Sequence, residues 1–317
     1  MNFIDLHCDT AMHIFESDKK LYKNDLCIDI NKLQEGEALA QFFAMFIEKD
    51  KVTDSYDYCK KMLKKFKNQL NENKEFISLC RNYSDLEKAK KEGKIGAFLT
   101  IEEGDAIKGE IEKLREFKKE GISLITLTWN FENDLGYPNA GFKFKDKGLK
   151  QRGIEVVEEM NNLGMLIDVS HLSDAGFYDC IKYSKKPIIA SHSNAREKSP
   201  HPRNLTDDMI KKLADNGGIT GINFCSAFLI DREDVSDLEL GTIDDMVRHI
   251  KHIRNIGGID VIGLGSDFDG IENKVERENA SQMMRLADRL SKEGFSINEI
   301  EKIFSENAKR VIKEVLI

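Results

Sequence analysis

Five side chains of the kinds that bind metal ions follow short apolar stretches of the chain. They are His7 and Asp9 near the N-terminus, then Glu102, His171 and His192. Acidic groups beside buried segments need a partner, and a cation is a natural one. Three histidines with two carboxylates form the nitrogen- and oxygen-rich set that suits zinc or neighbouring first-row ions. The pattern therefore predicts a metal site.

Five ligands exceed the ordinary need of one catalytic zinc ion, so the set favours two ions. If Glu102 bridges, His7 and Asp9 complete one site and His171 and His192 the other, with the ions roughly 3.5–4 Å apart. Such a pair binds and deprotonates a shared water near neutral pH, while one ion polarises a substrate carbonyl. The chemistry that this predicts is hydrolysis.

Each of these residues also has a plainer structural interpretation. His7 with Asp9 fits a buried histidine beside a helix-capping acid, and a lone histidine at a strand end is commonly structural. Glu103 fits an exposed loop acid better than Glu102 does, because Glu102 directly follows the apolar stretch. Three of the seven histidines end such stretches, however, which argues against coincidence.

Two further acids, Asp267 and Asp269, follow an apolar stretch that ends in small residues, which let other groups approach closely. Asp267 is a candidate proton carrier, and Asp269 fits a turn or helix-capping residue. All candidates would lie at the carboxyl ends of strands, where barrels build active sites.

The elements that position these residues are eight candidate strands. They are Phe3–Leu6, Ala40–Ile47, Ile95–Ile101, Ser123–Trp129, Met165–Val169, Pro187–Ala190, Gly218–Phe224 and Val261–Leu264. Amphipathic helices are predicted between most of them, including Glu110–Lys119, Gly153–Leu163, Thr206–Asn216 and Ile243–Asn255. This alternation predicts a parallel sheet closed into a (β/α)8 TIM barrel of the metal-dependent hydrolase type. A doubly wound open sheet is the alternative.

The whole chain, residues 1–317, is predicted to form this one barrel domain. The segment Val52–Lys94 is longer than one crossover needs, so we expect an elaboration after the second strand. Its lysine-rich part, Lys60–Lys67, fits a solvated helix face. Two closing helices are predicted near the C-terminus, the second beginning at Ser296 with Glu299 at capping-box spacing.

Composition argues against several classes of function. A net charge of −8 and an isoelectric point near 5.6 disfavour nucleic-acid and anionic-membrane partners. The six cysteines include no Cys-x-x-Cys pair, which disfavours thiolate zinc sites and a disulfide framework. Neither a signal-peptide pattern nor an apolar run of about 18 residues occurs, so we expect a cytoplasmic protein that acts on a small molecule.

The remaining histidines and Cys8 are predicted to have structural roles. His13 fits a structural residue near the site, and His249 and His252 fit solvated or packing residues on one helix face. His201 lies in a loop that borders the predicted site. Cys8 should face away from its two neighbours, because side chains alternate along a strand.

Taken in order, these motifs closely resemble the membrane (renal) dipeptidase family of zinc dipeptidases, within the amidohydrolase-like barrels. The resemblance spans nearly the whole chain. It rests on Ile-Asp-Leu-His-Cys-Asp-Thr at 4–10, Ile-Glu-Glu-Gly at 101–104, a Leu-Thr-Leu-Thr-like stretch at 124–128, Ile-Asp-Val-Ser-His-Leu-Ser at 167–173, Ala-Ser-His-Ser-Asn-Ala at 190–195, Pro-Arg-Asn at 202–204 and Gly-Ser-Asp-Phe-Asp-Gly at 265–270.

The resemblance implies two zinc ions with Glu102 as the bridge, in agreement with the residues alone. It also implies that Arg203, which otherwise looks like a surface residue, holds the substrate carboxylate, a task that suits a guanidinium fork. Asp267 matches the family acid that meets the substrate amine and passes a proton to the leaving nitrogen. Relatives in the family suggest a homodimer.

Trp129 departs from the family pattern, because better-known members carry a substrate-contacting histidine at this point. An indole offers one N–H and a large apolar face instead, so Trp129 is a candidate substrate-binding residue that either donates through its nitrogen or only shapes the pocket. The leading prediction is a dipeptidase in which a hydroxide bridging two zinc ions attacks the peptide bond. The alternatives are hydrolysis of N-acyl amino acids, lactams or lactones, and a non-catalytic metal-containing binding protein.

Overall fold

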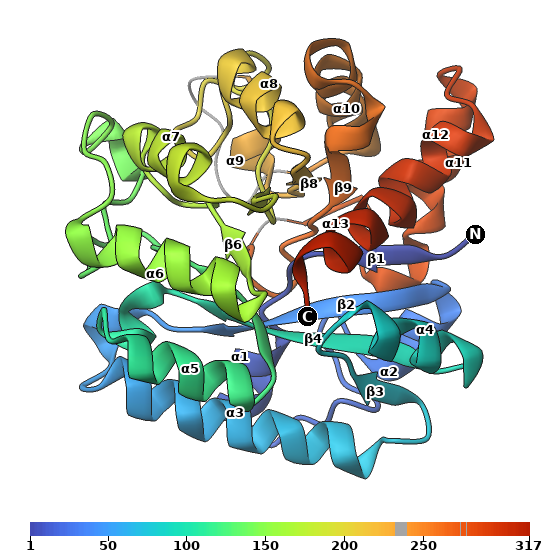
Figure 1. Ribbon diagram of the computed structural model, residues 1–317. Helices are drawn as coiled ribbons and strands as arrows, with labels where there is room; N and C mark the ends of the chain where they lie inside the picture. Colours follow the sequence, from blue (N-terminus) through green and yellow to red (C-terminus); the bar gives the residue numbers. More distant parts are fainter. Residues whose placement is uncertain (232–239, 273, 277) are drawn as a thin grey trace.

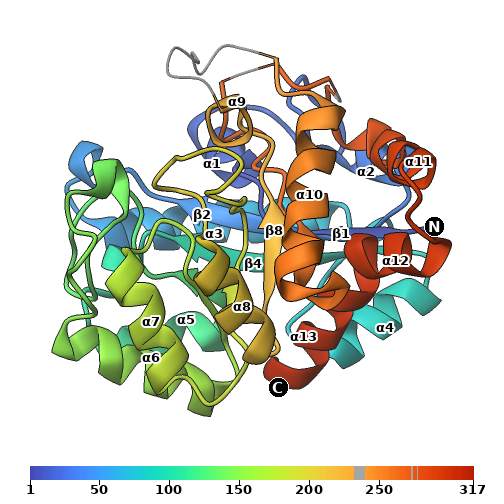
Figure 2. The same cartoon turned by 90° about the horizontal axis from the view of Figure 1, so that it is seen from above.

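The computed structural model describes residues 1–231, 240–272, 274–276 and 278–317. Parallel strands close into a barrel that helices surround, as the two views in Figures 1 and 2 show. The barrel strands are β1 (Phe3–Asp5), β2 (Ala38–Phe46), β4 (Ile95–Glu102), β5 (Ile122–Thr126), β6 (Leu166–Asp168), β7 (Ile189–Ala190), β8 (Ile219–Ile222) and β9 (Ile262–Leu264). Because β1 pairs with both β2 and β9, and β2 with β4, the ring is closed. The predicted (β/α)8 barrel is confirmed.

The predicted elaboration after the second strand consists of three elements. They are helix α3 (Ser55–Glu72), strand β3 (Ile77–Leu79) and helix α4 (Tyr83–Lys91). Strand β3 pairs with the first three residues of β4, whereas β5 pairs with its last four. The extra strand therefore extends the sheet outside the barrel, below the end that carries the candidate site.

The sequence predicted a solvated helix face for the lysine-rich part of α3, but these lysines contact neighbouring elements. Lys60 bonds to Glu116 and Glu120 at the end of α5 (Ile111–Lys119), and Lys67 also reaches Glu120. Lys65 donates to two carbonyl oxygens at the end of α1 (Thr10–Glu16). These contacts join the elaboration to its neighbours, which a linear pattern of lysines does not show.

The other helices cover the outside of the barrel (Figures 1 and 2). They are α2 (Ile30–Glu35), α6 (Gln151–Leu163), α7 (Asp174–Tyr183), α8 (Asp207–Asp215), α9 (Ser226–Leu229), α10 (Ile243–Gly257), α11 (Met284–Lys292), α12 (Ile297–Glu301) and α13 (Asn307–Val315). The capping box at Ser296 and Glu299 is present. Within the described ranges, none of the helices has both the length and the apolar character needed to cross a bilayer.

Two layers of apolar side chains hold the barrel together. Along β2, Phe42 points into the barrel and stacks on Phe98 of β4, with ring centroids 4.6 Å apart. The next residue, Phe43, points outward and contacts Phe66 of α3 at 4.9 Å. This alternation buries both faces of each strand, as a parallel sheet between helices and a filled interior requires. The barrel is thereby a rigid support for the loops at its carboxyl end.

Candidate active site

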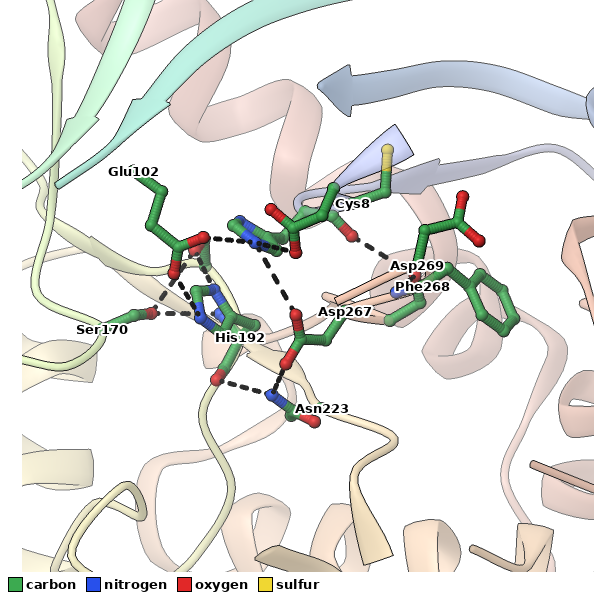
Figure 3. Close-up of polar contacts among 12 residues, drawn as sticks. Cys8, Glu102, Ser170, His192, Asn223, Asp267, Phe268 and Asp269 are labelled. Atoms are coloured by element: carbon green, nitrogen blue, oxygen red, sulfur yellow. Dashed lines mark hydrogen bonds and ion pairs between the residues drawn. The ribbon is translucent and has the colours of Figure 1, made fainter. Parts of the chain in front are cut away.

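The side chains predicted as metal ligands lie together at the carboxyl ends of β1, β4, β6 and β7. His7 Nε2 is 3.4 Å from Asp9 Oδ2 and 3.2 Å from Glu102 Oε2. The other oxygen of Glu102, Oε1, is 3.1 Å from His171 Nε2 and 3.5 Å from His192 Nε2. Figure 3 shows Glu102 directed into this cluster. The two oxygens of Glu102 thus face different histidines, although the His7 and His192 rings also contact each other, with centroids 3.9 Å apart.

Hydrogen bonds outside the cluster orient both of the later histidines. The Ser191 hydroxyl donates to Asp168 Oδ2 at 2.6 Å and lies 2.7 Å from His192 Nδ1, so this ring nitrogen is the donor to the serine. His171 Nδ1 lies 3.0 Å from Asn130 Oδ1, an oxygen that only accepts. In both rings the proton therefore sits on Nδ1, and Nε2 presents a lone pair to the cluster.

The buried polar atoms of the cluster fit divalent cations. The Nε2 lone pairs of His171 and His192 face each other at 3.1 Å. Both ring nitrogens of His7 and Oδ1 of Asp9 are buried without a hydrogen-bond partner in the described ranges. Buried polar atoms are normally satisfied, and a nitrogen–carboxylate set of this kind suits zinc or a similar ion.

The charges in the cluster also favour bound cations. Burial lowers the pKa of His171 to about 3 and lowers that of His192, so both rings are neutral, as ligands must be. Burial opposes ionisation of Glu102, but the surrounding histidines outweigh it and hold the pKa of this carboxyl well below its usual range. Burial raises the pKa of Asp9 to about 8, against the lowering effect of the neighbouring His7.

The carboxylate of Asp267 is directed toward the cluster, as Figure 3 shows. Its Oδ1 is 3.7 Å from His7 Nε2, and its Oδ2 accepts a hydrogen bond from Asn223 Nδ2 at 2.8 Å. Asp267 has a φ of 62°, a backbone conformation that favours glycine. The structure thus places the predicted proton carrier beside the predicted ligands.

The neighbours Asp269 and Cys8 do not join the cluster. Asp269 accepts hydrogen bonds from Thr10 Oγ1 at 2.6 Å and from the backbone N–H of Cys27 at 2.7 Å, so it ties together the loops around the site. Cys8 Sγ points toward the Phe42 carbonyl at 3.4 Å, away from the ligands, as predicted (Figure 3).

Among the described residues, Arg203 is a buried cation without an anionic partner. The residue is 4% exposed, and its side chain donates to Ser193 Oγ at 3.3 Å and to the His192 carbonyl at 3.2 Å. Its Nε has no partner, and no carboxylate in the described part of the chain lies within ion-pair distance. A buried charge is costly unless it is paired, so Arg203 is a candidate anion-binding residue.

A cavity of about 990 Å³ connects these groups. Its walls include Asp9, Glu102, His171, Arg203 and Asp267, whereas the more deeply buried His7 and His192 lie behind them. The predicted substrate residue Trp129 also lines this cavity, together with Phe46 and His201. The volume is ample for a small-molecule substrate.

Trp129 forms an aromatic wall beside the ligands. Its ring lies 4.9 Å from Phe46, 5.5 Å from Phe131 and 6.1 Å from His171. The indole therefore contacts two apolar rings and also lies near His171, a candidate metal ligand. Trp129 therefore combines a large hydrophobic surface with a position next to the reacting groups.

The prediction that Glu103 is an exposed loop acid was wrong. Glu103 is fully buried with a φ of 96°, and it accepts hydrogen bonds from the Trp129 N–H at 3.0 Å and from Asn133 Nδ2 at 2.5 Å. Burial raises the pKa of this carboxyl to about 7. The loop after β5 folds back over the end of β4, and this long-range contact is not visible in the local sequence.

The other histidines contact backbone or surface groups. His13 Nε2 lies 2.8 Å from the Asp269 carbonyl, and His252 pairs with Asp207 at 2.6 Å. His249 is buried between the Ala195 N–H and the Leu229 carbonyl. Sequence reasoning missed the orienting residues Asp168, Ser191 and Asn130. Only Asp168 carried a signal, since it is an acid at the end of an apolar stretch, like Glu102.

A (β/α)8 barrel with a histidine–carboxylate cluster at the carboxyl ends of its strands defines a metal-dependent hydrolase. The sequence profile of the membrane dipeptidase family, peptidase family M19, matches residues 1–316. The chain therefore belongs to this family of metallopeptidases, and the resemblance inferred from the motifs is confirmed.

Individual relatives agree with this assignment. An uncharacterized dipeptidase of Schizosaccharomyces pombe is 32% identical over 303 residues, which cover 90% of this chain and 71% of the relative. The solved structure of a dipeptidase AC, a metallopeptidase of family M19, has a TM-score of 0.91 at 23% identity, covering 100% and 99% of the two chains. A Rhodobacter sphaeroides metallopeptidase, solved with a phosphinate mimic of the dipeptide L-Ala-D-Ala, has a TM-score of 0.90 at 21% identity, covering 99% of each chain. The solved structures establish the shared fold.

Proposed function

We propose that this chain hydrolyses the peptide bond of dipeptides with two divalent metal ions, preferably zinc. Glu102 would bridge the ions, with His7 and Asp9 on one side and His171 and His192 on the other. The observation that carries the proposal is the placement of Glu102, whose two oxygens face the two ligand groups at 3.1–3.5 Å. The dipeptidase name of the fission yeast relative and the dipeptide mimic in the Rhodobacter sphaeroides structure support this substrate class.

When bound, the ions would lower the pKa of a coordinated water and polarise the scissile carbonyl. Arg203 would bind the substrate carboxylate, because it is the buried guanidinium of the cavity wall and has Nε free of any partner in the described ranges. Its carbonyl and hydroxyl contacts fix the direction of the fork. Because Arg203 and the candidate ligands line the same cavity, a substrate held in this way would lie beside the ligand cluster.

Asp267 would move the proton. Asn223 holds Oδ2 of this carboxylate, which leaves Oδ1, the oxygen that faces His7 Nε2, to accept a proton from water. The same oxygen would then give the proton to the departing amine nitrogen, as general acid–base catalysis requires. Because Asp267 lines the cavity, it would contact the reacting atoms directly.

The test is hydrolysis of a panel of small dipeptides by metal-depleted protein and by the same protein after zinc is restored. We expect cleavage only after restoration, and we expect Glu102→Gln to abolish it. Glu112→Gln is the matched control, because the Glu112 side chain is 82% exposed on helix α5 and does not line the cavity. Absence of metal-dependent cleavage for every dipeptide would remove the assignment.

A second candidate activity is favoured by Trp129. An apolar wall in place of a hydrogen-bonding histidine suits an N-acyl amino acid, a lactam or a lactone, whose acyl part carries no charged amine. Trp129→His should then raise turnover of dipeptides relative to acyl amino acids. Equal effects on both substrate classes would remove this candidate and leave the dipeptidase proposal intact.

A further inference from the structure

Arg203 lies in a loop whose ends are closed by backbone hydrogen bonds. The Arg196 N–H donates to the Leu205 carbonyl at 2.8 Å, and the Leu205 N–H donates to the Asn194 carbonyl at 2.8 Å. Arg203 lies between the closing residues, seven positions after Arg196 and two before Leu205. The direction in which its guanidinium points therefore depends on the shape of this loop.

The side chain of Arg196 fixes that shape from within. Its Nε donates to the carbonyl oxygen of Asn204 at 2.8 Å, and its Nη2 donates to that of Pro202 at 3.3 Å. These two carbonyl groups belong to the residues on either side of Arg203. One guanidinium thus holds the main chain directly before and after the predicted carboxylate-binding residue.

Asp174, the first residue of α7, in turn orients Arg196. Its two carboxylate oxygens accept hydrogen bonds from Nη1 at 2.7 Å and from Nη2 at 2.8 Å. The two side chains are only 13% and 10% exposed, so solvent screens this bidentate pair weakly. The ring of Phe142 lies 5.0 Å from the Arg196 guanidinium and restricts it further. The loop is therefore anchored to a helix of the barrel.

We propose that Arg196, oriented by Asp174, is a positioning residue that sets the affinity of the site for the substrate carboxylate. Arg196 does not line the cavity, so it acts through Arg203 rather than on the substrate. A lysine at this position would keep the charge but lose the planar fork that reaches four acceptor atoms at once. The inference rests on the proposed function, in which Arg203 binds the carboxylate.

The chain offers a matched control in Arg310. This arginine also donates to two backbone carbonyl groups, those of Gly217 and Asp260, which precede β8 and β9 at the opposite end of the barrel. Removing either guanidinium costs comparable backbone hydrogen bonds. Only Arg196 is next to the candidate carboxylate site.

The experiment compares wild-type protein with Arg196→Met, Arg196→Lys, Arg310→Met and Arg203→Met, each with zinc restored. The readouts are kcat and KM for alanyl-alanine, the inhibition constant of alanyl-alanine amide, which lacks the carboxylate, and the melting temperature. We expect Arg196→Met to raise KM about tenfold, with kcat within about twofold of wild type and the amide constant unchanged. Arg196→Lys should give a smaller rise in KM, and Arg310→Met none.

Three outcomes would overturn the inference. If a folded Arg196→Met or Arg196→Lys protein has an unchanged KM, then Arg203 does not need Arg196 to hold it in position. An equal weakening of the dipeptide and its amide means that the whole cavity is distorted. If Arg203→Met itself leaves KM unchanged, Arg203 does not bind the carboxylate, and the inference about Arg196 fails with that assignment. If Arg203→Met raises KM strongly but Arg196→Met does not, only the inference about Arg196 is overturned.

Discussion

The carboxylate of Glu103 accepts a hydrogen bond from the backbone N–H of Trp129 at 3.0 Å. This contact links the end of β4, which carries the candidate bridging ligand, to the loop that carries the aromatic wall. Glu103 keeps a φ of 96° to make it, a conformation that ordinarily favours glycine. Three donors, Trp129 N–H, Asn133 Nδ2 and Asp105 N–H, offset the cost of this backbone conformation and of burying the carboxyl.

Replacing Glu103 by alanine should release the Trp129 loop. Three donors would lose their acceptor, and each donor that is left buried and unsatisfied costs about 1–3 kcal/mol. Since Trp129 is the one tryptophan in the sequence, its intrinsic fluorescence reports the change directly, and we expect emission at longer wavelength as the indole becomes hydrated. Glu112→Ala, at an exposed position, is the control. An emission spectrum and unfolding free energy equal to those of wild type would refute this role of Glu103.

Replacing Ser191 by alanine should weaken metal binding without removing a ligand. The serine carries the hydrogen-bond connection from Asp168 to His192 Nδ1, and loss of such outer contacts typically costs about 10–100-fold in metal affinity. Zinc affinity is measured by competition with a chelator. Ser123→Ala is the matched control, because Ser123 Oγ is buried and has no hydrogen-bond partner in the described ranges. Equal zinc affinities for the two variants would contradict the orienting role.

His249 should make the protein less stable as the pH falls. Burial lowers its pKa from the ordinary 6.5 to about 4, and its Nδ1 must stay unprotonated to accept from the Ala195 N–H. Between pH 4 and pH 6.5 the unfolded chain binds a proton at His249 that the folded chain does not bind. The contribution of the neutral histidine to the free energy of unfolding is therefore lost as the pH falls from 6.5 to 4, and it does not change further below pH 4. Between pH 7 and pH 5 the loss is about 2 kcal/mol.

The measurement is urea unfolding of metal-free wild type and His249→Gln at pH 7 and pH 5. Glutamine stays neutral, so the difference between the two proteins isolates the histidine from every other titrating group. We expect the unfolding free energy of wild type to fall more than that of the variant on acidification. Parallel changes in both proteins would show that His249 does not contribute in this way.

The sequence was sufficient for the barrel because each strand is marked by local composition. All eight predicted strands overlap barrel strands, and the glycines that end α5, α6 and α8, namely Gly121, Gly164 and Gly217, have the positive φ values of 100°, 63° and 77° that a left-handed cap requires. The strand ends then direct the five candidate ligands to one place, since parallel strands in a barrel share a carboxyl end.

Contacts between loops were not predictable in the same way. Arg203 follows two prolines and looks like a surface residue until the loop closes over His192, and only the family resemblance pointed to it. Glu103 was misread because its partners lie 26 and 30 positions further along the chain. Arg196 carried no local signal at all, since its acceptors are the distant Asp174 carboxylate and main-chain carbonyls fixed by the fold of the loop.

The bridging role of Glu102 is tested by anomalous diffraction of zinc-loaded crystals, recorded on both sides of the zinc absorption edge. We predict two zinc peaks roughly 3.5–4 Å apart, with the Glu102 carboxylate between them. His7 and Asp9 should ligate one ion, and His171 and His192 the other. A single peak, or zinc bound away from Glu102, would show that this residue does not bridge two ions.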